Sequence, residues 1–128
     1  MASELQQDSR INDCGRDYDL AVAQYRNITE LPGYTLTLRK PLEVALFETF
    51  YGGNSPGFRA THLLPLANNS DGQVISGTDK TEDLACQDLS TKIVIRYECL
   101  HIGVPIKGLS HDDMILQKQY LESIIARA

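Results

Sequence analysis

The chain has little of what usually marks an enzyme, a secreted protein or a membrane protein. It has three cysteines, Cys14, Cys86 and Cys99, without a C-x-x-C pair, and it has no tryptophan. An odd, widely spaced set of cysteines is typical of a reducing compartment, although intermolecular bridges stay open. The polar, acidic start at Met1–Asp8 predicts no secretory signal peptide, and no apolar run approaches the ~20 residues that span a bilayer.

An excess of basic residues is also missing. The 128 residues include 12 Lys and Arg against 17 Asp and Glu, a formal net charge of -5. Generic nucleic-acid and anionic-membrane binders usually present a basic surface, so this balance argues against both classes. The hydrophobic fraction of 42% is ordinary for a folded protein. We therefore predict one soluble domain, 1–128, in which 1–15 is a polar arm.

Alternation of apolar and polar side chains predicts a sheet in the middle of the chain. Tyr34–Lys40 alternates cleanly, and Leu42–Tyr51 and Phe58–Leu66 flank a turn-forming cluster, which predicts a hairpin. Thr91–Ile102 is the strongest strand prediction, because β-branched residues alternate there. Asp17–Ile28 fits a short helix and a strand equally well.

The remaining segments are predicted to be a loop and a helix. Asn68–Ser90 is polar and rich in turn residues, which predicts a long loop, with a possible short strand at Gln73–Ser76. Ser110, followed by two aspartates, predicts the N-cap of an amphipathic helix over Ser110–Ala128. The predicted fold class is α+β, with an antiparallel sheet and a C-terminal amphipathic helix packed on it or on a partner's sheet.

No set of side chains predicts a catalytic or metal site, and we expect no cofactor. Ser110, His111 and Asp112 are consecutive, so their side chains splay around a helix start and do not form a relay. One cluster stays open. Cys99 and His101 would share a strand face with His62 opposite, either as ordinary core and strand-end residues or as the lining of a pocket between sheet and helix.

The last candidate site is the polar face of the predicted sheet. Cations there could contact phosphates while an aromatic ring stacks on a base, although an uncovered sheet face is ordinarily just solvated. The residues with this candidate role are Arg39, Thr49, Tyr51, Arg59, Thr61, Lys92 and Arg96.

The order of these segments resembles the coat proteins of single-stranded RNA bacteriophages. The resemblance is carried by the hairpin 42–66, the loop 68–90, the strand 92–100 and the helix 110–128. It implies a sheet that faces RNA inside a capsid, helices that cross onto a partner subunit, and a loop that makes contacts at symmetry axes. The family also has an N-terminal hairpin and a second C-terminal helix, and neither is predicted here.

Three hypotheses for function follow from these observations. The first is a self-assembling structural protein, a virion coat or other phage structural subunit, located in the virion or the cytoplasm. Its partners would be further copies of the chain, as homodimer and higher assembly, possibly RNA, and no membrane. The expected assembly interface consists of Ile95, Tyr97, Met114, Tyr120, Leu121, Ile124 and Ile125. The second is a small enzyme or ligand-binding domain, and the third an adaptor that binds another protein through the acidic loop 68–90.

Overall fold

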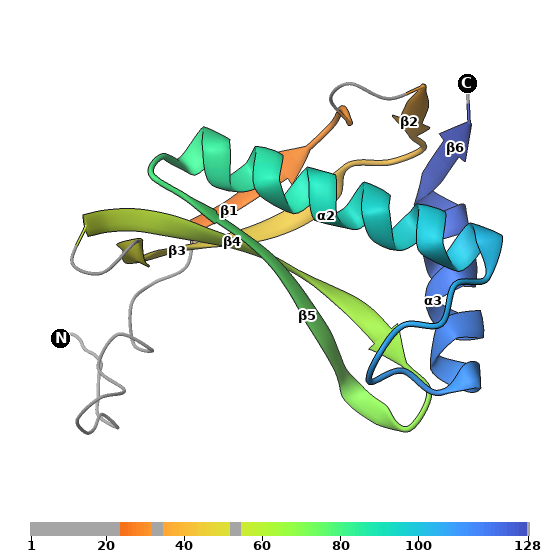
Figure 1. Cartoon of the computed structure of the whole chain (residues 1–128). Coiled ribbons are helices and arrows are strands. Elements are labelled where there is room, and N and C mark those ends of the chain that lie inside the picture. The colour runs from red at the N-terminus through yellow and green to blue at the C-terminus, as the bar shows by residue number, and fades with distance from the viewer. Residues whose placement is uncertain (1–23, 32–34, 52–54, 128) are drawn as a thin grey trace, which may run out of the picture.

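The computed structural model describes residues 24–31, 35–51 and 55–127, which form an α+β fold (Figure 1). The predicted arm at 1–15 and residues 17–23 lie outside the described residues. In chain order the elements are β1 (Gln24–Ile28), β2 (Leu36–Leu38), β3 (Leu42–Tyr51), β4 (Ser55–Leu66), β5 (Asn69–Asp79), α2 (Glu82–Ile102), α3 (His111–Ile124) and β6 (Ile125–Arg127). The predicted fold class, an antiparallel sheet followed by a C-terminal helix, is confirmed.

The main sheet is antiparallel throughout, with the strand order β1-β3-β4-β5. The predicted hairpin is confirmed as β3 and β4, in which Leu42, Val44 and Leu46 point alternately into the core. The strand predicted over residues 34–40 is shorter, covering only β2, and it pairs with β6 in a separate two-stranded sheet.

The strand predicted at Thr91–Ile102 is wrong, because these residues form the second half of α2. The helix begins after the N-cap Thr81, whose side chain accepts a hydrogen bond from the Leu84 N–H, and it ends at Gly103, which has a φ of 84°. The buried side chains recur every three or four positions, at Ala85, Cys86, Leu89, Ser90, Ile93, Val94, Tyr97 and Leu100. Burial of this face against β4 and β5 overrides the strand preference of the β-branched residues.

The long loop predicted at Asn68–Ser90 is also wrong. The short strand considered at Gln73–Ser76 is the centre of β5, which is eleven residues long, and α2 begins at Glu82. Polar residues occupy β5 because it is the last strand of the sheet, where one edge and one face are open. The acidic loop of the adaptor hypothesis is therefore regular structure.

The C-terminal helix begins as predicted. Ser110 and Asp113 form a reciprocal capping box before α3. The helix ends at Ile124 and does not reach Ala128, because the chain continues as β6. The backbone N–H of Arg39 donates to the Ile124 carbonyl at 2.7 Å, which links the two short strands to the end of α3.

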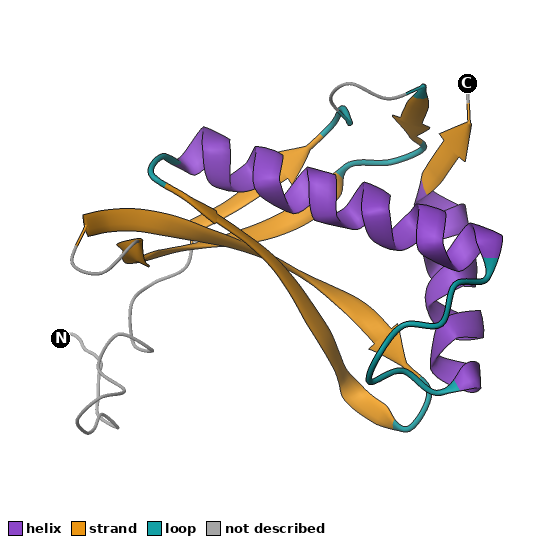
Figure 2. Cartoon of the chain, viewed as in Figure 1, coloured by secondary structure: helices purple, strands orange, loops and turns teal. Residues whose placement is uncertain are grey.

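Among the described residues, the two helices leave one face of the sheet open. α2 lies across one face, and α3 lies beside the far end of the β4–β5 hairpin (Figures 1 and 2). The figures show no helix on the opposite face in the part of the chain that the structure describes. Within that part, neither helix is both long and apolar enough to cross a membrane.

Candidate functional site

The uncovered sheet face is mixed in chemistry and not strongly basic. The strand register places Tyr25, Phe47 and Arg59 on this face. The Arg59 guanidinium lies 5.7 Å from the centroid of the Phe47 ring, a cation–π contact. Leu63 and Val74 are more than half exposed and extend the face across β4 and β5. Exposed apolar groups on a sheet face are typical of an interaction surface.

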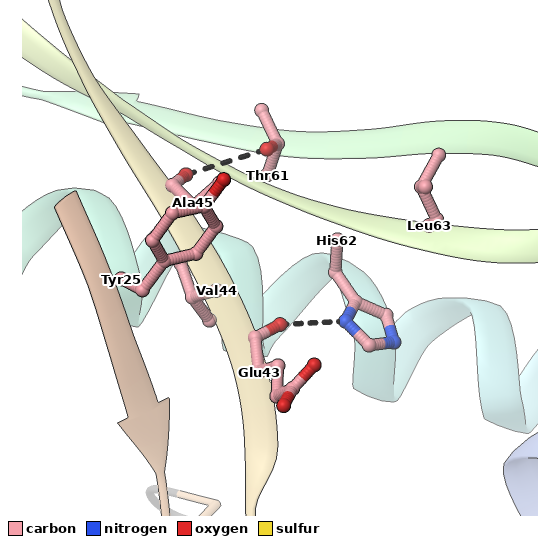
Figure 3. A pocket seen from close by; sticks show the side chains of 7 residues that line it. All are labelled: Tyr25, Glu43, Val44, Ala45, Thr61, His62 and Leu63. Carbon is pink, nitrogen blue, oxygen red and sulfur yellow. Dashed lines mark hydrogen bonds between the residues drawn. The ribbon is translucent and has the colours of Figure 1, made fainter. Parts of the chain in front are cut away.

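A hollow of about 380 Å³ opens where β3 and β4 diverge (Figure 3). His62 is its most constrained polar group: Nδ1 lies 2.7 Å from the Glu43 carbonyl oxygen, and Nε2 lies 2.7 Å from the Tyr120 hydroxyl. A carbonyl only accepts, so Nδ1 carries the proton and Nε2 accepts from Tyr120. The lining residues are Tyr25, Glu43, Val44, Ala45, Thr61, His62 and Leu63.

Burial lowers the pKa of His62 below its ordinary value, an effect that the hydrogen bond to Glu43 partly opposes. Burial also raises the pKa of Tyr120. His62 is therefore neutral near pH 7, but both of its nitrogens are occupied by partners within the chain. It joins α3 to the sheet and has no free nitrogen to act as a general base.

The outer edge of β5 is the second candidate surface. β5 is the last strand of the main sheet, and it has no strand partner on its other side among the described residues. The Thr78 N–H donates to Asp88 Oδ2 at 3.0 Å, so it points away from β4. Because N–H directions alternate along a strand, the N–H groups of Val74 and Ser76 also point outward. These groups are positioned to pair with another strand.

The structure separates the residues predicted to contact nucleic acid. Thr49, Arg59 and Thr61 share the uncovered sheet face by register, and Tyr51 belongs to the same strand as Thr49. Arg39 follows β2, outside the main sheet. Lys92 and Arg96 lie on α2 and not on the sheet face where they were predicted. Of the four candidate cations, Arg39, Arg59, Lys92 and Arg96, only Arg59 belongs to the main sheet.

Lys92 and Arg96 have partners within the chain. Lys92 Nζ lies 3.0 Å from Asp88 Oδ2. Arg96 Nη1 donates to the side-chain oxygens of Gln73 and Gln117, at 2.8 Å each. Gln117 is fully buried and donates in turn to Gln73 and to the Pro65 carbonyl. This network joins α2, β4, β5 and α3, and burial lowers the pKa of Arg96. No pattern in the sequence links these positions, so the network could not be predicted.

Most residues of the predicted assembly interface lie in the core of the chain itself. Tyr97, Leu121, Ile124 and Ile125 are buried. Met114 and Tyr120 are partly buried and pack against that core. Ile95 differs, because its side chain is 54% exposed on the outer face of α2. Of the seven predicted residues, Ile95 is therefore the one best placed to contact a partner.

The cluster proposed for an enzyme does not assemble around the hollow. His62 lines the hollow, whereas Cys99 and His101 lie on α2 and do not line it. His101 stacks on Tyr97 and its Nδ1 lies 3.9 Å from a Glu122 carboxylate oxygen. Among the described residues, no three His, Cys, Asp or Glu side chains are arranged to hold a metal ion. Cys86 and Cys99 are both free, and Cys14 lies outside the described residues.

Comparisons of the chain with protein-family models, with curated proteins and with solved structures found no match.

Proposed function

We propose that the chain is a self-assembling structural subunit of a virion coat, whose copies join through the outer edge of β5. The observation that carries this proposal is the open edge of an eleven-residue strand beside an uncovered, partly apolar sheet face. Natural monomeric proteins usually protect such edges with charge, proline or a covering segment. Among the described residues, the outward N–H groups of Val74 and Ser76 lack such protection. The outward N–H of Thr78 differs, because it donates a hydrogen bond to the Asp88 carboxylate.

The proposed interface differs from the strand predicted from the sequence. Residues 91–102 are helical and add no strand to a shared sheet. β5 takes this role, since strand pairing between two copies requires only that its N–H and C=O groups meet those of a second edge. The layout that resembles phage coat proteins included a long last strand at 92–100. The structure has a helix at these residues, so two helices, α2 and α3, follow the main sheet.

RNA contact is a subordinate part of the proposal. Arg59, Thr49 and Thr61 remain together on the uncovered face, where a phosphate or a sugar hydroxyl could bind. A single arginine supplies little counterion release, so RNA would add to assembly without driving it.

Replacement of Val74 by proline tests the edge. Val74→Pro removes one outward N–H and leaves the β4–β5 hydrogen bonds intact, because those use the alternate residues. We expect far-UV circular dichroism to show retained structure, and light scattering coupled to size-exclusion chromatography to show loss of dimers and larger species. Val74→Lys, which keeps the N–H but charges the edge, should weaken association in the same direction.

Val74→Thr is the matched control, because it keeps β-branching and the N–H, and it should assemble like the original chain. A chain that is strictly monomeric at high concentration would overturn the proposal. Unchanged assembly of a folded Val74→Pro variant would also exclude the β5 edge.

A further inference from the structure

Among the described residues, β5 has one free edge, and that edge is regular over only part of the strand. The pairing of β5 with β4 is uninterrupted from Gln73 to Asp79. On the other side of Gln73 the register shifts, and Gly72 has a φ of 78°, which breaks the alternation of the strand. Regular outward backbone groups therefore belong to Val74, Ser76 and Thr78.

Asp88 closes one end of this free edge. Its Oδ2 accepts a hydrogen bond from the Thr78 N–H at 3.0 Å, so the oxygen lies where a carbonyl of a neighbouring strand would otherwise bind. The same oxygen lies 3.0 Å from Lys92 Nζ, and this ion pair orients the carboxylate. A carbonyl brought to this place would meet a second acceptor with no proton to share. A second strand can therefore pair with Val74 and Ser76 but not with Thr78.

Val74 and Ser76 fit the same two residues of a second copy. In an antiparallel ladder, opposite residues whose backbone groups face each other exchange both of their N–H···O=C bonds. When Val74 lies opposite Ser76 of the second copy, Ser76 lies opposite Val74, and every outward backbone group of both residues has a partner. The twofold axis then passes beside Ile75. The edge is self-complementary, as an isologous interface requires.

Other registers leave these groups unpaired or blocked. A shift of one residue sets outward groups against inward ones, which forms no ladder. A shift of two residues towards Thr78 brings the Val74 carbonyl against the Asp88 carboxylate. A shift of two residues the other way sets Ser76 opposite Gly72, where the strand is irregular. Only the register that opposes Val74 and Ser76 avoids both obstacles.

We propose that two copies pair through antiparallel β5 strands in this register, with Val74 of each copy opposite Ser76 of the other, and that Asp88 sets the register. The inference rests on the proposed self-assembly through β5 and assigns it a symmetry and a register. The twofold axis is perpendicular to the sheet, so it joins the two four-stranded sheets edge to edge and leaves both uncovered faces on one side. The exposed Val74 and Leu63 side chains of both copies then lie together across the axis, which buries apolar surface.

Disulfide cross-linking tests the register. In a chain whose Cys14 and Cys99 are replaced by serine, the one remaining cysteine is Cys86, which is buried. Opposite residues of a hydrogen-bonded pair have Cα atoms about 5.5 Å apart, within the reach of a disulfide, whereas positions offset by two residues lie about 7–8 Å apart. We expect Val74→Cys co-expressed with Ser76→Cys to give a linked dimer on mild oxidation, and neither variant to give one alone.

Each other register gives a different product. A linked dimer from Val74→Cys alone or from Ser76→Cys alone would overturn the proposed register. The absence of any link in a mixture that light scattering shows to be associated would overturn it as well. If Val74→Pro abolished assembly in these cases, the β5 edge would stand and only the register would fail.

Asp88→Ala tests the role of the carboxylate. This change frees the Thr78 N–H, so the register shifted by two residues can pair three outward residues of each strand instead of two. Ser76 then faces Ser76 of the second copy, and Ser76→Cys alone should give a linked dimer. Lys92→Ala is the matched control, because it removes the ion pair but keeps the carboxylate, and Ser76→Cys should stay unlinked in it. An unlinked but folded Asp88→Ala variant would mean that Asp88 does not set the register.

Discussion

Gly77 shows how closely α2 approaches the sheet. A Cβ added at this position would lie 2.2 Å from the backbone nitrogen of Leu89 and 2.7 Å from the Ala85 carbonyl oxygen. Real Cβ atoms essentially never approach backbone so closely, and neither atom belongs to a side chain that can rotate away. A side chain at residue 77 therefore requires α2 to move off β5.

We predict that Gly77→Ala lowers the free energy of unfolding by about 2 kcal/mol or more, the range of overpacked core sites, measured by urea denaturation. Ser76→Ala is the control, because the neighbouring side chain lies on the uncovered face and should change stability by less than about 0.5 kcal/mol. A Gly77→Ala variant as stable as the original chain would show that α2 does not pack this closely.

Individual site residues were harder to predict than the hairpin that carries them. Thr49, Arg59 and Thr61 share a face because residues alternate along paired strands, and that rule can be read from the chain. The buried contacts of Gln117 and His62 could not be predicted. Each depends on where α3 meets the sheet, which no local pattern encodes.

Among the elements, α2 shows why a strand and a helix can be confused. Ile93, Val94 and Ile95 are consecutive and β-branched, so the segment satisfies a strand pattern and a helix pattern at once. The helix signals lay outside the predicted segment: Thr81 as N-cap with two acids after it, and Gly103 as C-cap. The strand predicted over 91–102 contains neither capping residue.

α3 is held to the sheet by polar contacts as well as by its buried leucine and isoleucine. Tyr120 on α3 donates to His62 on β4, and the two rings are stacked with centroids 5.9 Å apart. His62 in turn donates to the Glu43 carbonyl on β3. One imidazole therefore links three elements at the point where β3 and β4 diverge. Protonation of its Nε2 would remove the acceptor of the Tyr120 hydrogen bond, which connects α3 to the sheet.

The lowered pKa of His62 predicts a pH-dependent stability. The unfolded chain binds this proton more readily than the folded chain, so the contribution of neutral His62 is fully present above the ordinary pKa of 6.5. It is lost as the pH falls through that value towards the lower folded pKa. We expect the free energy of unfolding to fall more steeply in the original chain than in His62→Phe, compared by urea denaturation from roughly one pH unit above 6.5 to roughly one below.

His101 and His111 are present in both proteins, so the difference between the two profiles isolates the contribution of residue 62. Nuclear magnetic resonance of the His62 ring protons should place its midpoint below that of the unfolded chain. Identical pH profiles for the original chain and His62→Phe would mean that burial does not perturb this histidine.

The molecule as a whole combines an acidic composition with surfaces that favour contact. The buried face of the sheet is filled by α2, while the β5 edge and the opposite sheet face stay open among the described residues. These surfaces associate through backbone hydrogen bonds and apolar burial, which need no net charge. The net charge of -5 opposes association, because every copy repels the next.

Direct contact between copies and bridging of copies by RNA should respond to salt in opposite ways. If copies join through the β5 edge, raising ionic strength from 0.01 M to 0.15 M shortens the Debye length from about 30 Å to about 8 Å and should increase the fraction of large species in sedimentation velocity. If RNA bridges the copies through Arg59 and its neighbours, the same change should release RNA and reduce that fraction. Nuclease treatment before the measurement separates the contributions, since direct contacts survive it. A large species that disappears with salt or nuclease would contradict assembly through the β5 edge, and would make RNA the main connection between subunits.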